Sequence, residues 1–161
     1  MLAIRSADPA DADAIWAVLE PVIRGGETYA LPRDMPRSDA LAWWFAKSHE
    51  VFVAESGGQV IGTHFLRPNQ LGGGSHVCNC GYVTAPAASG QGVATAMCSH
   101  SLDHARKRGF RAMQFNFVVS VNDRAVRLWQ HFNFDIVGRL PAAFFHPVHG
   151  FVDVYVMYRQ L

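Results

Sequence analysis

The residues best placed to bind a ligand form a short glycine-rich loop before a predicted helix. No Asp, Glu, Lys or Arg occurs from Thr84 to Leu102, so the backbone of this loop must bind any ligand. Free N–H groups in the first turn of a helix carry partial positive charge and suit an anion such as phosphate. Glycine lets that anion approach the backbone closely. We therefore predict an anion site formed by Gly90, Gln91, Gly92, Val93, Ala94 and Thr95.

Three interpretations of this loop compete. A Walker loop needs Lys and a hydroxyl residue after its last glycine, whereas Gly92 is followed by Val93 and Ala94. A dinucleotide fingerprint needs an acidic residue about 20 positions later, and the strand found there carries Gln114 and Asn116 instead. An ordinary strand, loop and helix without a ligand is the third alternative. The Gly-x-Gly pattern alone does not exclude it.

Two asparagines lie in otherwise apolar predicted strands, Asn79 between two cysteines and Asn116 between two phenylalanines. Burying an amide without a hydrogen-bond partner costs on the order of 2 kcal/mol or more. Each amide therefore either bonds a loose backbone group where the strands separate, or binds the amine and the neighbouring carboxylate of a substrate. On the second interpretation Asn79 and Asn116 are the catalytic residues that orient an acceptor.

A general base is harder to assign, because neither strand carries a carboxylate. The choices are His76 at the start of a strand, Glu27 or Tyr29 in the early loop, or a water bound by Asn79. His146 near the C-terminus is a further candidate, for closing over a substrate. These four residues are the predicted substrate contacts.

One histidine pair has the spacing of metal ligands. His100 and His104 are four residues apart on a predicted helix. No third ligand is apparent in the sequence, so we predict no metal site.

The elements that must position these residues follow from hydrophobic periodicity and turn signals. Pro21 and the pair Gly25–Gly26 are expected to end the first helix, and Ser38 to begin the second. Strands are expected at 2–5, 51–55, 59–66, 77–83, 112–119, 135–140 and 151–158, and helices from residue 8, at 38–47, at 93–108 and from residue 122. This order predicts an α/β fold whose mixed sheet has one βαβ crossover at its centre.

Composition narrows the class of protein. The 161 residues suit a single domain, 1–161, and half of them are hydrophobic. The 14 Lys and Arg against 13 Asp and Glu give no basic stripe, so we expect neither a nucleic acid nor an anionic membrane surface as partner. No segment approaches a membrane span or a signal peptide. The three cysteines suit the core of a protein in the reducing cytoplasm.

Two motifs follow one another along the chain. The first is the loop from Gly90 to Met97, preceded by the strand ending Gly81-Tyr82-Val83. The second is the stretch from Asn122 to Phe134, with an Asn, an Ala, a Leu-aromatic pair and a Phe-x-Phe-like end. In this order and spacing they resemble the GCN5-related N-acetyltransferase (GNAT) family, and the resemblance extends from about Val51 to the C-terminus.

This resemblance implies a fold, a co-substrate and a reaction. In the family the sheet is mixed and mostly antiparallel, with flanking helices, and its central parallel strands splay to admit acetyl-CoA. The implied reaction is direct attack of an amine on the thioester, with the carbonyl oxygen held by a backbone N–H near Val83. Besides the loop, the implied cofactor contacts are Tyr82, Val83, Ser89, Asn122 and Trp129.

Within the family, the strands around Asn79 and Asn116 are most similar to fungal enzymes that acetylate the proline analogue azetidine-2-carboxylate. In those enzymes the equivalents of Asn79 and Asn116 lie at the substrate, and the equivalent of Asn122 lies at the cofactor. The implied acceptor is the amine of a small molecule, in particular an amino acid or amino-acid analogue. A homodimer is a further expectation.

Two positions depart from the family pattern. Ser89 stands where Gln or Arg is usual, and Trp129 stands where a Tyr often protonates the leaving thiolate. A thiol pKa near 8.5 makes the thiolate a reasonable leaving group without that acid. The departures favour one alternative, an acyl-CoA-binding or regulatory module. A second alternative, an enzyme that acetylates a protein or peptide, would need an open, acidic groove.

Overall fold

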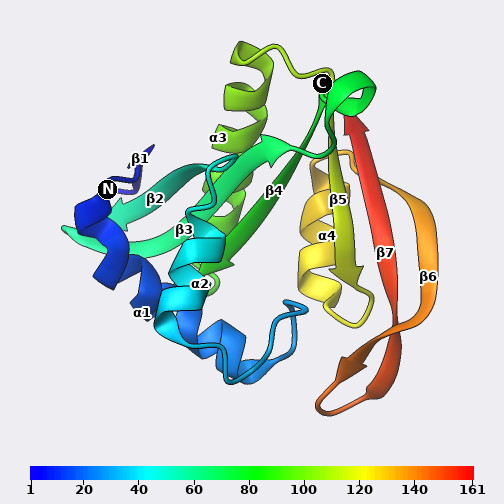
Figure 1. Ribbon diagram of the computed structural model, residues 1–161, viewed down its shortest axis with the longest axis horizontal. Coiled ribbons are helices and arrows are strands. Elements are labelled where there is room, and N and C mark those ends of the chain that lie inside the picture. Colours follow the sequence, from blue (N-terminus) through cyan, green and yellow to red (C-terminus); the bar gives the residue numbers. More distant parts are fainter.

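The computed structural model describes residues 1–161 and contains one mixed sheet flanked by helices (Figure 1). Its strands are β1 Ala3–Ser6, β2 Glu50–Ser56, β3 Gln59–Pro68, β4 Val77–Thr84, β5 Ala112–Val119, β6 Asp135–His146 and β7 Gly150–Gln160. Its α-helices are α1 Ala12–Gly25, α2 Arg37–Trp44, α3 Val93–Lys107 and α4 Asp123–His131. Short 3-10 turns lie at η1 Pro9–Asp11, η2 Gly72–Gly74 and η3 Pro86–Ala88. The predicted α/β fold is confirmed.

The sheet separates at its centre. Its seven strands lie in the order β1-β2-β3-β4-β5-β7-β6, and β4 with β5 is the parallel pair. That pair is joined only at Val77 with Ala112 and at Cys78 with Met113. Beyond these pairs the two strands diverge, and Figure 1 shows α4 between them. The predicted splay of the central parallel strands is therefore confirmed.

The two faces of the sheet bury different sets of apolar side chains, because successive residues of a strand point to opposite faces. The face under α1 and α2 buries Ile15, Trp44, Val53, Phe65 and Val83 together. The face under α3 and α4 buries Cys78, Cys80, Leu102, Met113 and Trp129 together. Cys78 and Cys80 are free thiols in this core, as predicted. The splay of β4 from β5 thus opens between two packed layers.

A row of rings crosses β2, β3 and β4 under α3. His64 stacks between Phe52 and Tyr82, with ring centroids 5.0 Å and 5.7 Å away. Its Nε2 lies 3.2 Å from Nδ1 of His100, while its own Nδ1 is buried without a hydrogen-bond partner. Burial lowers the pKa of His64 to about 3, so this ring is neutral in the folded protein. Tyr82 therefore packs against a neutral, buried ring on the α3 side of the sheet.

Two helix boundaries differ from the prediction. The pair Gly25–Gly26 ends α1 as predicted, with Gly26 as its left-handed C-cap, but Pro21 does not, and the helix continues through it because Ile23 is buried in the core beyond it. Packing of that turn outweighs the backbone hydrogen bond that proline removes. The second helix runs from Arg37 to Trp44 with Pro36 at its N-cap, so Ser38 lies inside its first turn and caps nothing.

The last two strands are longer than predicted. The first of them was expected to end at Leu140, just before Pro141, which cannot donate a ladder hydrogen bond. The structure instead contains a bulge between Leu140 and Phe144, after which β6 continues to His146. Asp153 of β7 accepts a hydrogen bond from the Ala142 N–H at 2.9 Å and pairs with Arg139, which stabilises the bulge.

No helix in the structure combines the length and the apolarity needed to cross a membrane.

Candidate acyl-transfer site

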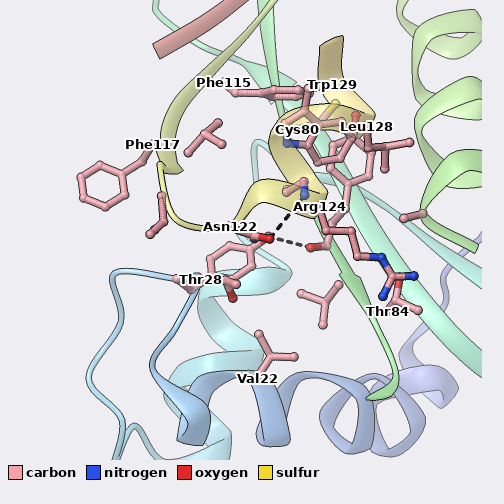
Figure 2. Close-up of a pocket in the computed structure, with 18 of the residues that line it drawn as sticks. Val22, Thr28, Cys80, Thr84, Phe115, Phe117, Asn122, Arg124, Leu128 and Trp129 are labelled. Carbon is pink, nitrogen blue, oxygen red and sulfur yellow. Dashed lines mark hydrogen bonds between the residues drawn. The ribbon is translucent and has the colours of Figure 1, made fainter. Parts of the chain in front are cut away.

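A cavity of about 960 Å³ lies where β4 and β5 diverge. Its walls come from the end of α1 and the following loop, from the end of α2, from β3, β4 and β5, from the loop before α3 and the start of α3, and from α4. Figure 2 shows Val22 and Thr28 on one side of this space and Phe115, Leu128 and Trp129 on the other. The cavity therefore extends from a glycine loop at one end to the polar side chains of Asn79 and Asn116 at the other.

The glycine loop forms the first end of the cavity. Gly90 and Gly92 have φ values of +82° and +79°, a region that other residues enter only with strain. Gly92 is the N-cap of α3 and supplies no side-chain bond, so the first N–H groups of the helix have no side-chain cap. Three of these N–H groups belong to Val93, Ala94 and Thr95, which line the cavity. Such a terminus favours an anion.

Gln91 and Ser89 differ in their relation to this end. The Gln91 side chain donates to the Ala87 carbonyl at 3.1 Å, and Gln91 does not line the cavity. Ser89 lines it and accepts a hydrogen bond from Nη1 of Arg124 at 2.6 Å. Arg124 thus places a cation beside the loop, although Ser89 itself lacks the charge or amide usual at this position.

Arg124 and Arg127 were missed in the sequence analysis, although both line the cavity. They stand three residues apart on α4, which places them on the same side of the helix. That spacing was the signal available in the sequence. The Arg124 side chain bonds Ser89, which lies 35 positions earlier in the chain, so only the fold brings the two residues together.

The edge of β4 that faces the splay has free backbone groups. The ladder between β3 and β4 is bracketed by two bonds, Asn69 N–H to Val77 O and Ala85 N–H to Ile61 O, both 2.8 Å. Because antiparallel bonding alternates along a strand, the N–H of Val83 points to β3. The N–H groups of its neighbours Tyr82 and Thr84 point toward β5, which has diverged. These two are the donors near Val83 that face the cavity.

Asn79 forms a polar bridge at the point of separation. Its Nδ2 donates to the Gln114 carbonyl of β5 at 2.9 Å, and its Oδ1 accepts from Nε of Arg67 at 3.2 Å. Asn79 is 7 % exposed and lines the cavity. Of the two alternatives for this amide, the bond to a loose backbone group is present, and one N–H remains for a ligand.

Asn116 forms a second polar cluster on β5. A bulge between Phe115 and Val118 interrupts the pairing with β7 at this residue and turns its side chain, as bulges do. Nδ2 of Asn116 donates to Oδ1 of Asn69 at 2.7 Å, and its Oδ1 accepts from Nε2 of Gln114 at 2.9 Å. Asn69, which sequence reasoning gave no role, thus fixes the orientation of the Asn116 amide.

Aromatic rings form the wall beside these amides. Tyr29, Trp43 and Phe65 line the cavity, and Tyr29 packs edge-on to Trp43 with ring centroids 5.9 Å apart. The Tyr29 hydroxyl donates to the Tyr82 carbonyl at 3.2 Å. Burial raises the pKa of Tyr29, so its phenol stays protonated and cannot act as a general base.

Three predicted substrate residues do not line the cavity: Glu27, His76 and His146. Glu27 and His76 are exposed, the first after the end of α1 and the second before β4. Nδ1 of His146 accepts the backbone N–H groups of Val148 and His149 at 3.1 Å and 3.2 Å, which closes the β6–β7 turn. The interpretation of this histidine as a lid over the substrate conflicts with its place in the hairpin.

Trp129 and Asn122 lie on α4 at the inner wall. Trp129 is 9 % exposed and packs on Tyr82 and Phe115, with ring centroids 5.0 Å and 4.8 Å away. Oδ1 of Asn122 accepts the Ala125 N–H at 3.3 Å and caps the helix. The Tyr82 hydroxyl lies 2.7 Å from the Ser101 hydroxyl, and burial raises its pKa. Packing is the function the structure gives to Trp129.

The sequence model of the acetyltransferase (GNAT) family matches residues 16–134, a span that contains the loop, both strand amides and α4. The chain belongs to the GNAT family. Membership confirms the predicted class of enzyme, an acyltransferase that uses acetyl-CoA.

Similar proteins of known structure share the whole fold. A GCN5-related N-acetyltransferase from Kribbella flavida is 40 % identical, with a TM-score of 0.95 over 99 % of this chain and 98 % of that one. The yncA protein of Salmonella typhimurium, solved with its cofactor acetyl-CoA, is 24 % identical, with a TM-score of 0.87 over 100 % of this chain and 94 % of that one. The second likeness supports the GNAT fold alone.

A fungal protein also matches, in agreement with the fungal resemblance of the central strands. The N-acetyltransferase aca1 of Schizosaccharomyces pombe is 32 % identical over 98 residues, which are 60 % of this chain. The aligned region spans 47 % of the yeast protein, about half its length.

Proposed function

We propose that this chain is a single N-acetyltransferase domain that transfers an acetyl group from acetyl-CoA to the amine of a small molecule, an amino acid or amino-acid analogue. The observation that carries the proposal is one continuous cavity. It joins a backbone anion site at Gly90 to Thr95 with the amides of Asn79 and Asn116 across the strand separation. An anionic carrier and an amine acceptor can meet there.

The residues of the first end fit the pyrophosphate of coenzyme A. The uncapped N-terminus of α3 provides N–H groups, and Gly90 and Gly92 leave the backbone uncovered, with no atom within 4 Å of a Cβ built on Gly92. Arg124 and Arg127 add positive charge, and no Asp or Glu lines the cavity. Acetyl-CoA supplies an activated acetyl group as a thioester. The N–H groups of Tyr82 and Thr84 would hold its acyl arm along β4.

Direct attack by the amine is the mechanism that this site favours. Cys80 is the thiol in the cavity wall, and burial raises its pKa well above the usual value, so it supplies no thiolate nucleophile. No carboxylate or imidazole lines the cavity either. The proton of the amine therefore leaves to water, including water bound by the free N–H of Asn79.

The amides contribute by orientation. Asn116 is fixed by Asn69 and Gln114, and Asn79 by Gln114 and Arg67, so both amides are held before an acceptor enters. Pre-positioned partners lower the entropic cost of bringing the amine to the thioester. Each amide keeps hydrogen-bonding capacity for the acceptor.

A homodimer is the assembly that we propose, formed through the hairpin of β6 and β7. Large apolar side chains are exposed there, with Val137 60 %, Phe145 65 % and Phe151 74 % exposed. Phe145 and Phe151 face each other across the two strands with ring centroids 5.0 Å apart. Light scattering should give the mass of two chains, and Phe145→Ser with Phe151→Ser should give that of one.

We also propose that the protein works in the cytoplasm, because Cys78, Cys80 and Cys98 are free thiols and form no disulfide.

Thiol release tests the proposed reaction. Purified protein is mixed with acetyl-CoA and, one at a time, with a panel of amino acids, amino-acid analogues and simple amines. We expect thiol release that requires both protein and an acceptor, with the N-acetylated product detected by mass spectrometry. Tight calorimetric binding of acetyl-CoA without acceptor-dependent release would instead identify a CoA-binding module. Release only with peptides would identify a peptide acetyltransferase.

A further inference from the structure

Positive charge lines the cavity at two separate places. Arg124 and Arg127 project from α4 near the glycine loop, whereas Arg67 lies at the end of β3, paired in register with Asn79. Thr84 lies five positions after Asn79 on β4, which corresponds to roughly 16 Å at about 3.3 Å per residue. Arg67 is therefore too far from the loop to share one phosphate with Arg124.

Arg67 has almost no partner within the protein. Its Nε donates to Oδ1 of Asn79 at 3.2 Å, and this is the one hydrogen bond of the Arg67 side chain in the structure. Several other arginines pair with carboxylates, as Arg5 does with Asp11 and Arg139 with Asp153, whereas Arg67 has no carboxylate partner. Of the five N–H donors of a guanidinium, four are left over in Arg67.

The surroundings of Arg67 supply no anion. Its partner across the strands is Asn79, and Phe65, two residues earlier on β3, lies on the same face of the sheet, with the Trp43 ring packed edge-on to it at 5.8 Å between centroids. His49 stacks on Phe65 with ring centroids 4.1 Å apart, and burial first, then the charge of Arg67, lower its pKa. A half-buried guanidinium against apolar rings needs an anion from outside the chain, and a planar carboxylate matches its paired N–H groups.

We propose that Arg67 binds the carboxylate of the acceptor, which is an α-amino or imino acid with an apolar body. This inference rests on the proposed acyl transfer and names its substrate class. Asn79 holds Nε and so turns the remaining N–H groups toward the cavity. With its carboxylate on Arg67, the acceptor has its amine beside Asn79, between β4 and β5, and its apolar body against Phe65 and Trp43.

Matched acids and amides test the assignment. L-Leucine is compared with L-leucinamide, and L-proline with L-prolinamide, in wild type and in Arg67→Gln. The amine of a carboxamide is less protonated at neutral pH than that of the acid, so amine reactivity alone favours the amides. We expect wild type to prefer the acids by about tenfold or more in kcat/KM, and Arg67→Gln to lose about 10- to 100-fold with the acids. Values for the amides should stay within about threefold.

Arg111→Gln is the matched control, because Arg111 is exposed, lies outside the cavity and makes no side-chain hydrogen bond. It removes the same charge and should leave all values unchanged. In both variants the melting temperature and the Kd for acetyl-CoA should match wild type. Equal loss with acids and amides, or no loss in Arg67→Gln, would overturn the assignment.

A binding measurement separates this inference from the proposed reaction. Protein saturated with coenzyme A is titrated calorimetrically with L-leucine and L-leucinamide. If no acceptor is turned over but the acid alone binds, and Arg67→Gln abolishes that binding, the carboxylate site stands and the acyl transfer fails. If acceptors are acetylated with no preference for the acid, the transfer stands and the site fails. Absence of both binding and turnover would refute the site.

Discussion

Substitution of Gly81 should alter binding at the acceptor end of the cavity and leave binding at the coenzyme end unchanged. It lies in β4 between two cavity-lining neighbours, and its φ is not positive, so space alone requires glycine there. A Cβ at this position would lie 2.5 Å from Cε1 of Phe65 and 2.9 Å from the Tyr29 hydroxyl oxygen. Ordinary contact begins near 3.4 Å, so the Phe65 ring must move by about 0.9 Å.

That movement has a calculable cost. Phe65 is 3 % exposed and is enclosed by His49 and Trp44, with ring centroids 4.1 Å and 5.0 Å away. Overpacking of a core costs about 1–3 kcal/mol, which for a domain of this size lowers the melting temperature by about 2–12 °C. The Tyr29 hydroxyl is also displaced from the Tyr82 carbonyl.

The assay measures melting temperature, acetyl-CoA affinity and acceptor kinetics on Gly81→Ala. We expect KM for the acceptor to rise by about fivefold or more, equivalent to about 1 kcal/mol, while the Kd for acetyl-CoA changes by less than about twofold. Gly138→Ala in β6 is the control, because its Cβ would meet Val156 at an ordinary 3.5 Å. Indistinguishable KM and melting temperature in the two variants would refute this account of the aromatic wall.

Three further predictions concern the coenzyme end and the layer behind Tyr82. Gly92→Asp puts a negative charge and a strained φ at the N-terminus of α3, so calorimetric affinity for acetyl-CoA should fall at least about tenfold, or about 1.4 kcal/mol; unchanged affinity would remove the loop from the site. Trp129→Phe should keep most of the activity, because Trp129 packs on Tyr82 and Phe115; a loss near the 10²-fold typical of a general acid would contradict that role. His64 has a folded pKa of about 3 against 6.5 for a free histidine, so the unfolded chain binds the extra proton, and stability present above pH 6.5 is lost as pH falls. At pH 5 the free energy of unfolding is lower by about 2 kcal/mol for this reason. Urea unfolding of His64→Phe should therefore show a weaker pH dependence than that of wild type. An identical pH dependence would mean that another group titrates.

Local patterns predicted the parts of the site that depend on neighbouring residues. The helix after Gly92, the strand before it and the helix that begins near Asn122 follow from turn residues and hydrophobic periodicity, and all three are present. The splay itself was implied by the family resemblance. Asn79 and Asn116 were recognised because an amide in an apolar strand needs a partner.

Contacts across long stretches of chain were beyond such patterns. Asn116 bonds Asn69 over 47 positions, and Tyr29 reaches the Tyr82 carbonyl over 53. These contacts depend on which strands adjoin, which hydrophobic periodicity does not encode. The place of His146 outside the cavity was not foreseen for a related reason, because the bulge after Leu140 lengthens β6 and makes this histidine part of a tight hairpin.

The same bulge governs how the outer edge of the sheet meets other chains. β6 is an edge strand of 12 residues whose unpaired backbone groups could act as a template for strand addition and aggregation. Pro141 and the left-handed Ala142, with φ of +49°, divide that edge into two short runs that do not lie in one line. Strand-by-strand extension of the sheet is thereby disfavoured. In the homodimer that we propose, the second copy would contact the hairpin through side chains, so the apolar surface would serve assembly without acting as a template for fibres.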